Sequence, residues 1–225
     1  MKKSAALLIG ASGLIGSQLL EFLLKNEDYS SVTALTRKPL AVKSDKFINL
    51  VVDFEDPSLL REKMTPGSVI FCCIGTTMKN VKGDKAAYRK IDFDIPAVIG
   101  RLGIEKGYKQ FLLVSAVGAD SHSSNFYLRL KGEVEDAIGK LPFESIHIFR
   151  PSILIGKRKE RRRGEGIAQI FGKYFSFLLA GKWAKYKAIA NNEVAYAMML
   201  AADRNNTGVI IHHYSEIKNC NSKND

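Results

Sequence analysis

A tyrosine and a lysine four residues apart are the first residues in this chain whose types and spacing could do chemistry: Tyr127-Leu-Arg-Leu-Lys131. On a helix, residues i and i+4 share a face, so the Lys131 ammonium would lie beside the Tyr127 phenol. A neighbouring positive charge lowers the pKa of a phenol from its usual value of about 10. Tyr127 could then give a proton to a carbonyl oxygen that is being reduced, or take one from an alcohol that is being oxidised.

Ser115 lies twelve residues before Tyr127, at the end of a predicted strand. Its hydroxyl would hydrogen-bond the same substrate oxygen, so Ser115, Tyr127 and Lys131 are the predicted catalytic residues. The Y-x-x-x-K spacing also arises in ordinary amphipathic helices, where both side chains only pack. The elements around the three residues therefore decide between catalysis and packing.

A glycine-rich turn near the N-terminus predicts a cofactor site. The apolar run 5–9 predicts a short buried strand, and residues 10–16, Gly-Ala-Ser-Gly-Leu-Ile-Gly, follow it directly and open a helix. In a dinucleotide site, Gly10 allows the tight turn, Gly13 lets the backbone approach a pyrophosphate, and Gly16 lets the helix pack closely on the sheet. The first N–H groups of the helix favour a phosphate. The same turn could be a plain strand–helix connection, but its context favours nucleotide binding.

The end of the second predicted strand, 31–36, bears on which nicotinamide cofactor would bind. Arg37-Lys38 follows it, at the place where a Rossmann sheet meets the adenosine ribose. An acidic residue there binds the free 2′-hydroxyl of NAD, whereas a basic residue suits the 2′-phosphate of NADP. The pair could also be an ordinary exposed turn. We expect NADPH, with NADH less favoured. The predicted cofactor-binding residues are Gly10, Ser12, Gly13, Leu14, Ile15, Gly16, Arg37, Lys38, Asp53, Gly75, Thr76, Lys131, Arg150 and Pro151.

Strand-like and helix-like segments alternate along the chain. The predicted strands are 5–9, 31–36, 47–52, 68–74, 110–115, 145–149 and 209–212, and the predicted helices after the first are 57–64, 84–106, 126–139, 164–179 and 191–203. This alternation predicts right-handed βαβ units, and so an α/β fold with a doubly wound parallel sheet. We expect one Rossmann domain over 1–217, with a small C-terminal helical appendage. Within it, the part from about 151 would form a substrate or lid region, and 218–225 would be a frayed tail.

Composition and cysteine content bound the class of protein. The 225 residues, 46% hydrophobic, suit one globular domain, and no apolar run approaches the ~20 residues needed to span a membrane. The first strand begins by Ala5, which leaves no room for a secretory signal, so a cytoplasmic protein is expected. Cys72 and Cys73 would point to opposite faces of a strand and are poor disulfide partners; with Cys220 they make an odd, low count typical of a reducing compartment.

The net charge of +11 is partly local, because six of the seven residues 157–163 are basic. No aromatic residue interleaves that run for base stacking, so we expect a solvated loop without specific nucleic-acid binding, which could also attract an anionic cofactor or substrate. The histidines do not predict a metal site. His212 and His213 are neighbours on a strand and point apart, while His122 and His147 stand isolated in the sequence.

Six short segments carry a resemblance to a known family: residues 71–77, 90–92, 118–120, 123–126, 131–135 and 149–151. With the G-x-x-G-x-x-G spacing, they resemble the Tat-interacting-protein oxidoreductases, small atypical members of the short-chain dehydrogenase/reductase superfamily. The resemblance implies a Rossmann fold, NADPH binding and a Ser/Tyr/Lys site at Ser115, Tyr127 and Lys131. It also implies that Arg150-Pro151 closes over the nicotinamide. Ala116 departs from the family, because many relatives carry a hydroxyl residue there.

Two functions follow from these features. The first is an NADPH-dependent oxidoreductase acting on a small carbonyl or alcohol substrate. The alternative is a regulatory or redox-sensing protein that binds NADPH and contacts a protein partner through its C-terminal segment, without turnover.

Overall fold

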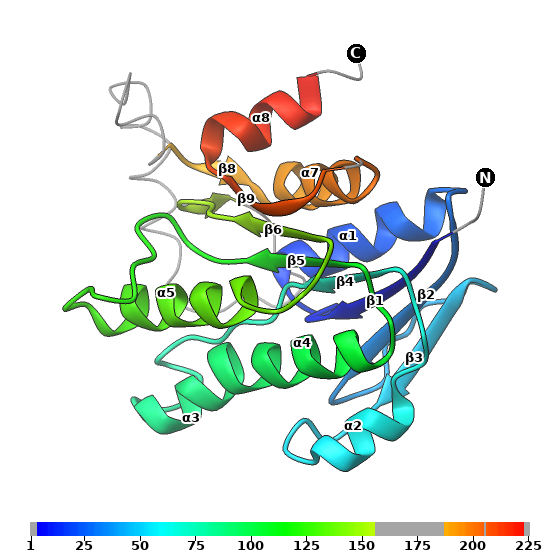
Figure 1. The fold of residues 1–225 in the computed structure, drawn as a ribbon, viewed down its shortest axis with the longest axis horizontal. Helices are drawn as coiled ribbons and strands as arrows, with labels where there is room; N and C mark the ends of the chain where they lie inside the picture. The colour runs from blue at the N-terminus through cyan, green and yellow to red at the C-terminus, as the bar shows by residue number, and fades with distance from the viewer. Residues whose placement is uncertain (1–3, 156–186, 205, 223–225) are drawn as a thin grey trace.

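The computed structural model describes residues 4–155, 187–204 and 206–222. These residues build a seven-stranded parallel sheet in the order β3-β2-β1-β4-β5-β6-β9, with helices on both faces (Figure 1). The strands are β1 Ser4–Ile9, β2 Tyr29–Thr36, β3 Phe47–Val51, β4 Val69–Cys72, β5 Gln110–Val114, β6 Ser145–Phe149 and β9 Gly208–His212. A separate two-stranded sheet pairs β7 Leu154–Ile155 with β8 Ile189–Ala190. The predicted doubly wound α/β fold is confirmed.

Helices cover the sheet because its strands are apolar on both faces. One face carries α1 Leu14–Lys25, α7 Asn191–Ala202 and α8 Tyr214–Ser222; the other carries α2 Pro57–Lys63, α3 Lys85–Arg89, α4 Ile95–Glu105 and α5 Phe126–Gly139 (Figure 1). Neighbouring strand residues enter opposite cores, as a period of two requires. Leu8 packs on the α1 side and Leu7 on the α4 side. Cys72 and Cys73 divide in the same way, and both are free thiols, as predicted.

The segment predicted as one helix over 84–106 is interrupted. Asp84 caps α3. A single π-helical turn, η1 Lys90–Asp94, follows α3, and α4 begins at Ile95. Pro96 lies in the first turn of α4, directly after the π-helical turn, and has no N–H to continue the helical hydrogen bonds there. The π-helical turn holds Asp92, which is only 2% exposed. Such turns often occur at functional sites.

The C-terminal segment is more ordered than its sequence predicts. Residues 218–222 were expected to fray but continue α8. Two residues of this helix, Ile217 and Cys220, are buried in the core. Within the region expected to form a lid, α7 packs beside α1 and β9 extends the sheet (Figure 1). The basic run 157–163 and the predicted helix 164–179 lie outside the described residues. Over the described part of the chain, no helix is both long and apolar enough to cross a membrane.

His147, which stands isolated in the sequence, has close partners in the fold. Pairing of β6 with β9 brings its Nδ1 to 2.8 Å from Nε2 of His212, and its Nε2 lies 2.9 Å from Oγ of Ser145. The ring of Phe149 stacks on His212 with 4.5 Å between centroids. Burial lowers the pKa of both histidines to about 4, so both are neutral at pH 7.

Candidate functional site

A cleft of about 410 Å³ opens at the carboxyl ends of β1, β4, β5 and β6. It lies where the strand order reverses between β1 and β4, the place where doubly wound sheets bind ligands. The lining residues are Gly13, Leu14, Ile15, Cys73, Ile74, Gly75, Thr76, Asp92, Val114, Ser115, Ala116, Val117, Tyr127, Lys131, Pro151, Ser152, Ile153 and Leu154. All three predicted catalytic residues are among them.

The glycine-rich turn forms one wall of this cleft. Gly10 has a φ of +84°, and a Cβ there would come within 2.5 Å of the Cys73 carbonyl group. A Cβ on Gly16 would collide with the Gly10 carbonyl oxygen, so the close packing predicted for Gly16 is present. Gly13 precedes α1 and provides no side-chain cap for its first N–H groups. The positive end of a twelve-residue helix therefore faces the cleft beside a glycine cradle, which fits the phosphates of a nucleotide.

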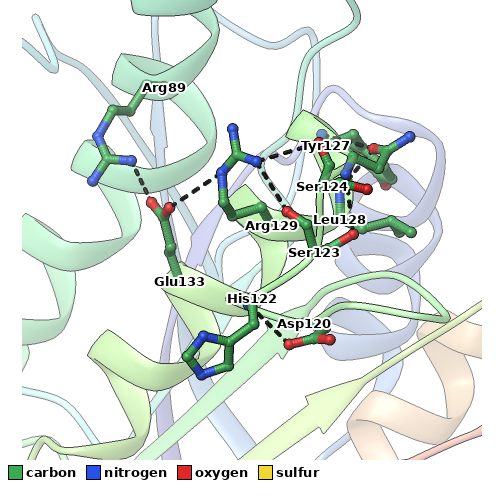
Figure 2. Close-up of polar contacts among 10 residues, drawn as sticks. Arg89, Asp120, His122, Ser123, Ser124, Tyr127, Leu128, Arg129 and Glu133 are labelled. Atoms are coloured by element: carbon green, nitrogen blue, oxygen red, sulfur yellow. Dashed lines mark hydrogen bonds and ion pairs between the residues drawn. The ribbon is translucent and has the colours of Figure 1, made fainter.

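The opposite wall is the first turn of α5, which carries Tyr127. Asn125 caps the helix, its side chain accepting a hydrogen bond from the Tyr127 N–H at 2.9 Å. Arg129 donates to two carbonyl groups of the preceding loop, and Glu133 accepts from Arg89 on α3 (Figure 2). These contacts tie the helix start to the loop before it and to α3, and so hold the backbone of Tyr127 in place.

Tyr127 is 40% exposed, and its ring meets the ring of Tyr88 edge to face at 6.4 Å. The Tyr88 hydroxyl donates to the Thr76 carbonyl at 3.1 Å, which anchors that ring. Partial burial raises the pKa of Tyr127 above its usual value; Lys131 opposes the rise, and Asp92 adds to it. The lowered pKa expected from Lys131 is therefore wrong, because burial of the phenol outweighs the lysine charge and a carboxylate absent from the helix pattern adds to the rise.

That carboxylate is Asp92. Its Oδ1 lies 2.9 Å from Nζ of Lys131, and its Oδ2 accepts the Thr76 N–H at 2.8 Å. The side chains are 7% exposed for Lys131 and 1% for Asp92, so the pair is buried. Burial lowers the pKa of Lys131, but attraction to Asp92, the hydrogen bond to Asp92 and the nearby Tyr127 together raise it above the ordinary value. Asp92 was not predicted as a site residue, although it belongs to the segment 90–92 that carries the family resemblance.

Ser115 belongs to a second polar cluster, which it forms with Glu135 and Arg150. Its hydroxyl donates to Oε1 of the Glu135 carboxylate, and Arg150 donates through Nε to both oxygens of the same carboxylate at 3.0 and 3.1 Å. The Arg150 side chain is therefore paired with Glu135 and is not part of the cleft lining, whereas Pro151 does line the cleft. Glu135 was also not predicted. Its position one turn after Lys131, within the segment 131–135, was the available signal.

Six other predicted cofactor residues lie outside the cleft lining. Two of them, Gly10 and Gly16, shape the glycine turn behind it. Ser12, Arg37, Lys38 and Asp53 are exposed, the last three just beyond the carboxyl ends of β2 and β3. Asp53 accepts the backbone N–H of Glu55 at 2.9 Å. The strand ends that carry Arg37 and Asp53 belong to the same edge of the sheet as the cleft, and their cofactor contacts stay predictions.

Comparison with known proteins finds consistent matches. A family model described as NAD(P)H-binding matches residues 10–140. The rat protein HTATIP2 is 34% identical over 202 residues, covering 88% of this chain and 81% of its own length. FMP52 of Debaryomyces hansenii is 34% identical over 206 residues, covering 88% of both chains. Among solved structures, MoeE5 in complex with UDP-glucose and NAD aligns with a TM-score of 0.70 at 16% identity, covering 95% of this chain and 79% of that one; it shares the fold.

These relatives correct one expectation. FMP52 proteins from Debaryomyces hansenii, Coccidioides immitis, Kluyveromyces lactis and Candida albicans are named mitochondrial. The expected cytoplasmic location is therefore wrong as an inference, because the lack of a secretory pattern does not distinguish the compartments inside a cell.

Proposed function

Because the chain belongs to the NAD(P)H-binding family and is a member of the Tat-interacting-protein oxidoreductase group with HTATIP2 and FMP52, we propose that it is an NADPH-dependent oxidoreductase for a small carbonyl compound and its alcohol. The observation that carries the proposal is the meeting of two features in one cleft. The glycine turn before α1 lies on one wall, and Tyr127 and Lys131 lie on the other. Each pattern is common alone, whereas their convergence is what hydride transfer to a carbonyl requires.

The residues around the cleft fit the parts of NADPH. The N-terminus of α1, with Gly13 to Ile15, would hold the pyrophosphate, and Lys131 would hold the nicotinamide ribose. Arg37, exposed after β2, would pair with the 2′-phosphate. NADPH, when bound, supplies the hydride that goes to the carbonyl carbon.

Tyr127 would supply the matching proton. Its raised pKa keeps the phenol protonated at pH 7, so that it can donate to the oxygen of a carbonyl being reduced. Lys131 would stabilise the phenolate left behind, because its ammonium attracts that negative charge, and Asp92 keeps the lysine charged and in place. A hydride and a proton added to a carbonyl compound give the alcohol, and the cofactor leaves oxidised.

NADPH oxidation across a panel of small aldehydes and ketones tests the proposal. Tyr127→Phe should lower the rate by about 10²- to 10⁴-fold, the usual contribution of a positioned acid, with NADPH affinity nearly kept. Tyr196→Phe, on α7 and packed on Phe22, is the control that should oxidise NADPH at the parental rate. Tight NADPH binding with no oxidation on any substrate would favour the regulatory alternative and reject turnover.

A further inference from the structure

The direction of the Ser115 hydroxyl follows from its partner. A serine hydroxyl has one proton to donate and two lone pairs that accept, whereas an ionised carboxylate only accepts. Because Ser115 bonds to the Glu135 carboxylate, its single proton is committed to that bond. Ser115 also lines the cleft, so what it can offer a ligand is a lone pair.

Arg150 keeps Glu135 in the accepting role. Its guanidinium donates to both carboxylate oxygens, and Glu135 is 5% exposed. Paired charge-assisted bonds of this kind are strong, and they fix the plane of the carboxylate. The three residues come from rigid parts of the fold: Glu135 from the middle of α5, Arg150 from the residue after β6, and Ser115 from the residue after β5. The Ser115 N–H bonds the Phe149 carbonyl at 2.7 Å, which fixes the serine backbone to β6.

We infer that Glu135 and Arg150 are positioning residues that turn the Ser115 proton away from the cleft, so that Ser115 accepts a hydrogen bond from a substrate hydroxyl instead of donating one to a carbonyl. The inference rests on the proposed function and specifies its ligand class. An alcohol could donate to Ser115 and accept from Tyr127, whereas a ketone could only accept from Tyr127. The cleft therefore holds a small alcohol more tightly than the corresponding ketone. Ala116, next along the lining, has no hydroxyl to act in place of Ser115.

Binding measurements on complexes that cannot turn over test this difference. Cyclohexanol and 1-phenylethanol are titrated into the NADPH-loaded protein, and cyclohexanone and acetophenone into the protein loaded with NADP⁺. The parent should bind each alcohol about three- to tenfold more tightly than its ketone, the value of one hydrogen bond. Glu135→Gln gives Ser115 an amide neighbour that can donate, so the serine proton can turn to the cleft. This variant should bind the ketones more tightly than the parent does and the alcohols more weakly.

Asp136→Asn is the matched control, because it removes the same charge from the next residue of α5, which is exposed and outside the cleft lining. It should keep the parental ratio of alcohol to ketone affinity. A parent that binds ketones more tightly than alcohols, or that binds neither pair, would overturn the inference. An unchanged ratio in Glu135→Gln would also overturn it.

The hydrogen bond itself can be measured without cofactor, from the melting temperatures of Ser115→Ala, Glu135→Ala and the double variant. The loss in the double variant should fall short of the summed single losses by about 2–4 °C, because both changes break the same bond. Additive losses would overturn the inference. The outcome is separable from the proposed function: if Tyr127→Phe abolishes NADPH oxidation while ketones bind the parent better than alcohols, the function stands and the role of Glu135 falls.

Discussion

Replacing Asp92 with asparagine should expose how much the buried ion pair contributes to stability. Asp92→Asn keeps the size of the side chain, and its amide oxygen can still accept the Thr76 N–H, so the change mainly removes one charge. Lys131, 7% exposed, would then be a buried ammonium without its partner. Removing one member of a buried ion pair typically lowers the free energy of unfolding by about 3–5 kcal/mol. Because the acceptor for the Thr76 N–H is kept, we expect a loss at the low end, about 3 kcal/mol. For a chain of this length that corresponds to a melting temperature lower by about 6–12 °C.

The pH dependence of this loss identifies its cause. In the parent, burial lowers the pKa of Lys131, but Asp92 and Tyr127 together hold it above the ordinary 10.5. The contribution of the charged lysine to stability is therefore complete at neutral pH and is lost only as pH rises past that pKa. In Asp92→Asn, burial acts without the carboxylate and places the pKa of Lys131 below its ordinary value. At a pH between the lowered pKa of Lys131 in the folded variant and its ordinary pKa in the unfolded chain, the unfolded chain binds more protons than the folded one. The variant therefore gains stability as pH rises through this range. The deficit against the parent should therefore shrink from pH 7 to pH 10.

Urea denaturation of parent and variant at pH 7, 8, 9 and 10 measures this deficit. Asp136→Asn, which removes an exposed charge from α5, should lie within about 0.5 kcal/mol of the parent throughout. A deficit for Asp92→Asn below about 1 kcal/mol, or one that does not change with pH, would refute the reasoning from the buried pair.

Three further results are expected. The free energy of unfolding should fall as pH drops from 6.5 towards 4, by up to about 1.4 kcal/mol per pH unit for each of His147 and His212, because these histidines bind a proton readily only in the unfolded chain. Denaturation at pH 7 and pH 5 checks this, and equal free energies at the two pH values would contradict it. Arg37→Ala should weaken NADPH binding by at least about tenfold and leave NADH binding nearly as it was, since one charge-assisted bond to a phosphate is lost; calorimetric titration decides, and equal affinity of the parent for both nucleotides would be the opposing result. Gly16→Ala should lose much of its thermal stability and its NADPH binding, because the new Cβ meets the Gly10 carbonyl oxygen, whereas Gly139→Ala meets no atom within 4 Å and is the control; similar melting of both variants would speak against the packing argument.

Local signals in the sequence located most elements of the site. The helix predicted over 126–139 and the strand predicted over 145–149 have those bounds in the structure, since the cap at Asn125 and the apolar periodicity are properties of neighbouring residues. The glycine turn was equally readable, because the strand, turn and helix follow one another without a spacer.

What the sequence could not predict are the polar pairings across the fold. Asp92 reaches Lys131 from a different helix, Glu135 takes the proton of Ser115, and His147 meets His212 on a neighbouring strand. Each pairing depends on strand order, on the π-helical turn, or on which rotamer a buried charge adopts to find its partner. A helix pattern shows that Lys131 follows Tyr127 by one turn, but it shows neither how far the phenol is buried nor that a carboxylate lies beside the lysine. The direction of the Tyr127 pKa shift was therefore beyond the reach of spacing alone.

Transfer of isotope from cofactor to product tests the central claim most directly. NADPH that carries deuterium at both C4 positions of the nicotinamide is incubated with the protein and the panel of small aldehydes and ketones, and the products are examined by mass spectrometry. Direct hydride transfer predicts an alcohol that carries one deuterium on its carbinol carbon, formed by the parent and reduced by about 10²- to 10⁴-fold in Tyr127→Phe. Tight binding of the labelled cofactor with no deuterium in any alcohol would contradict the account.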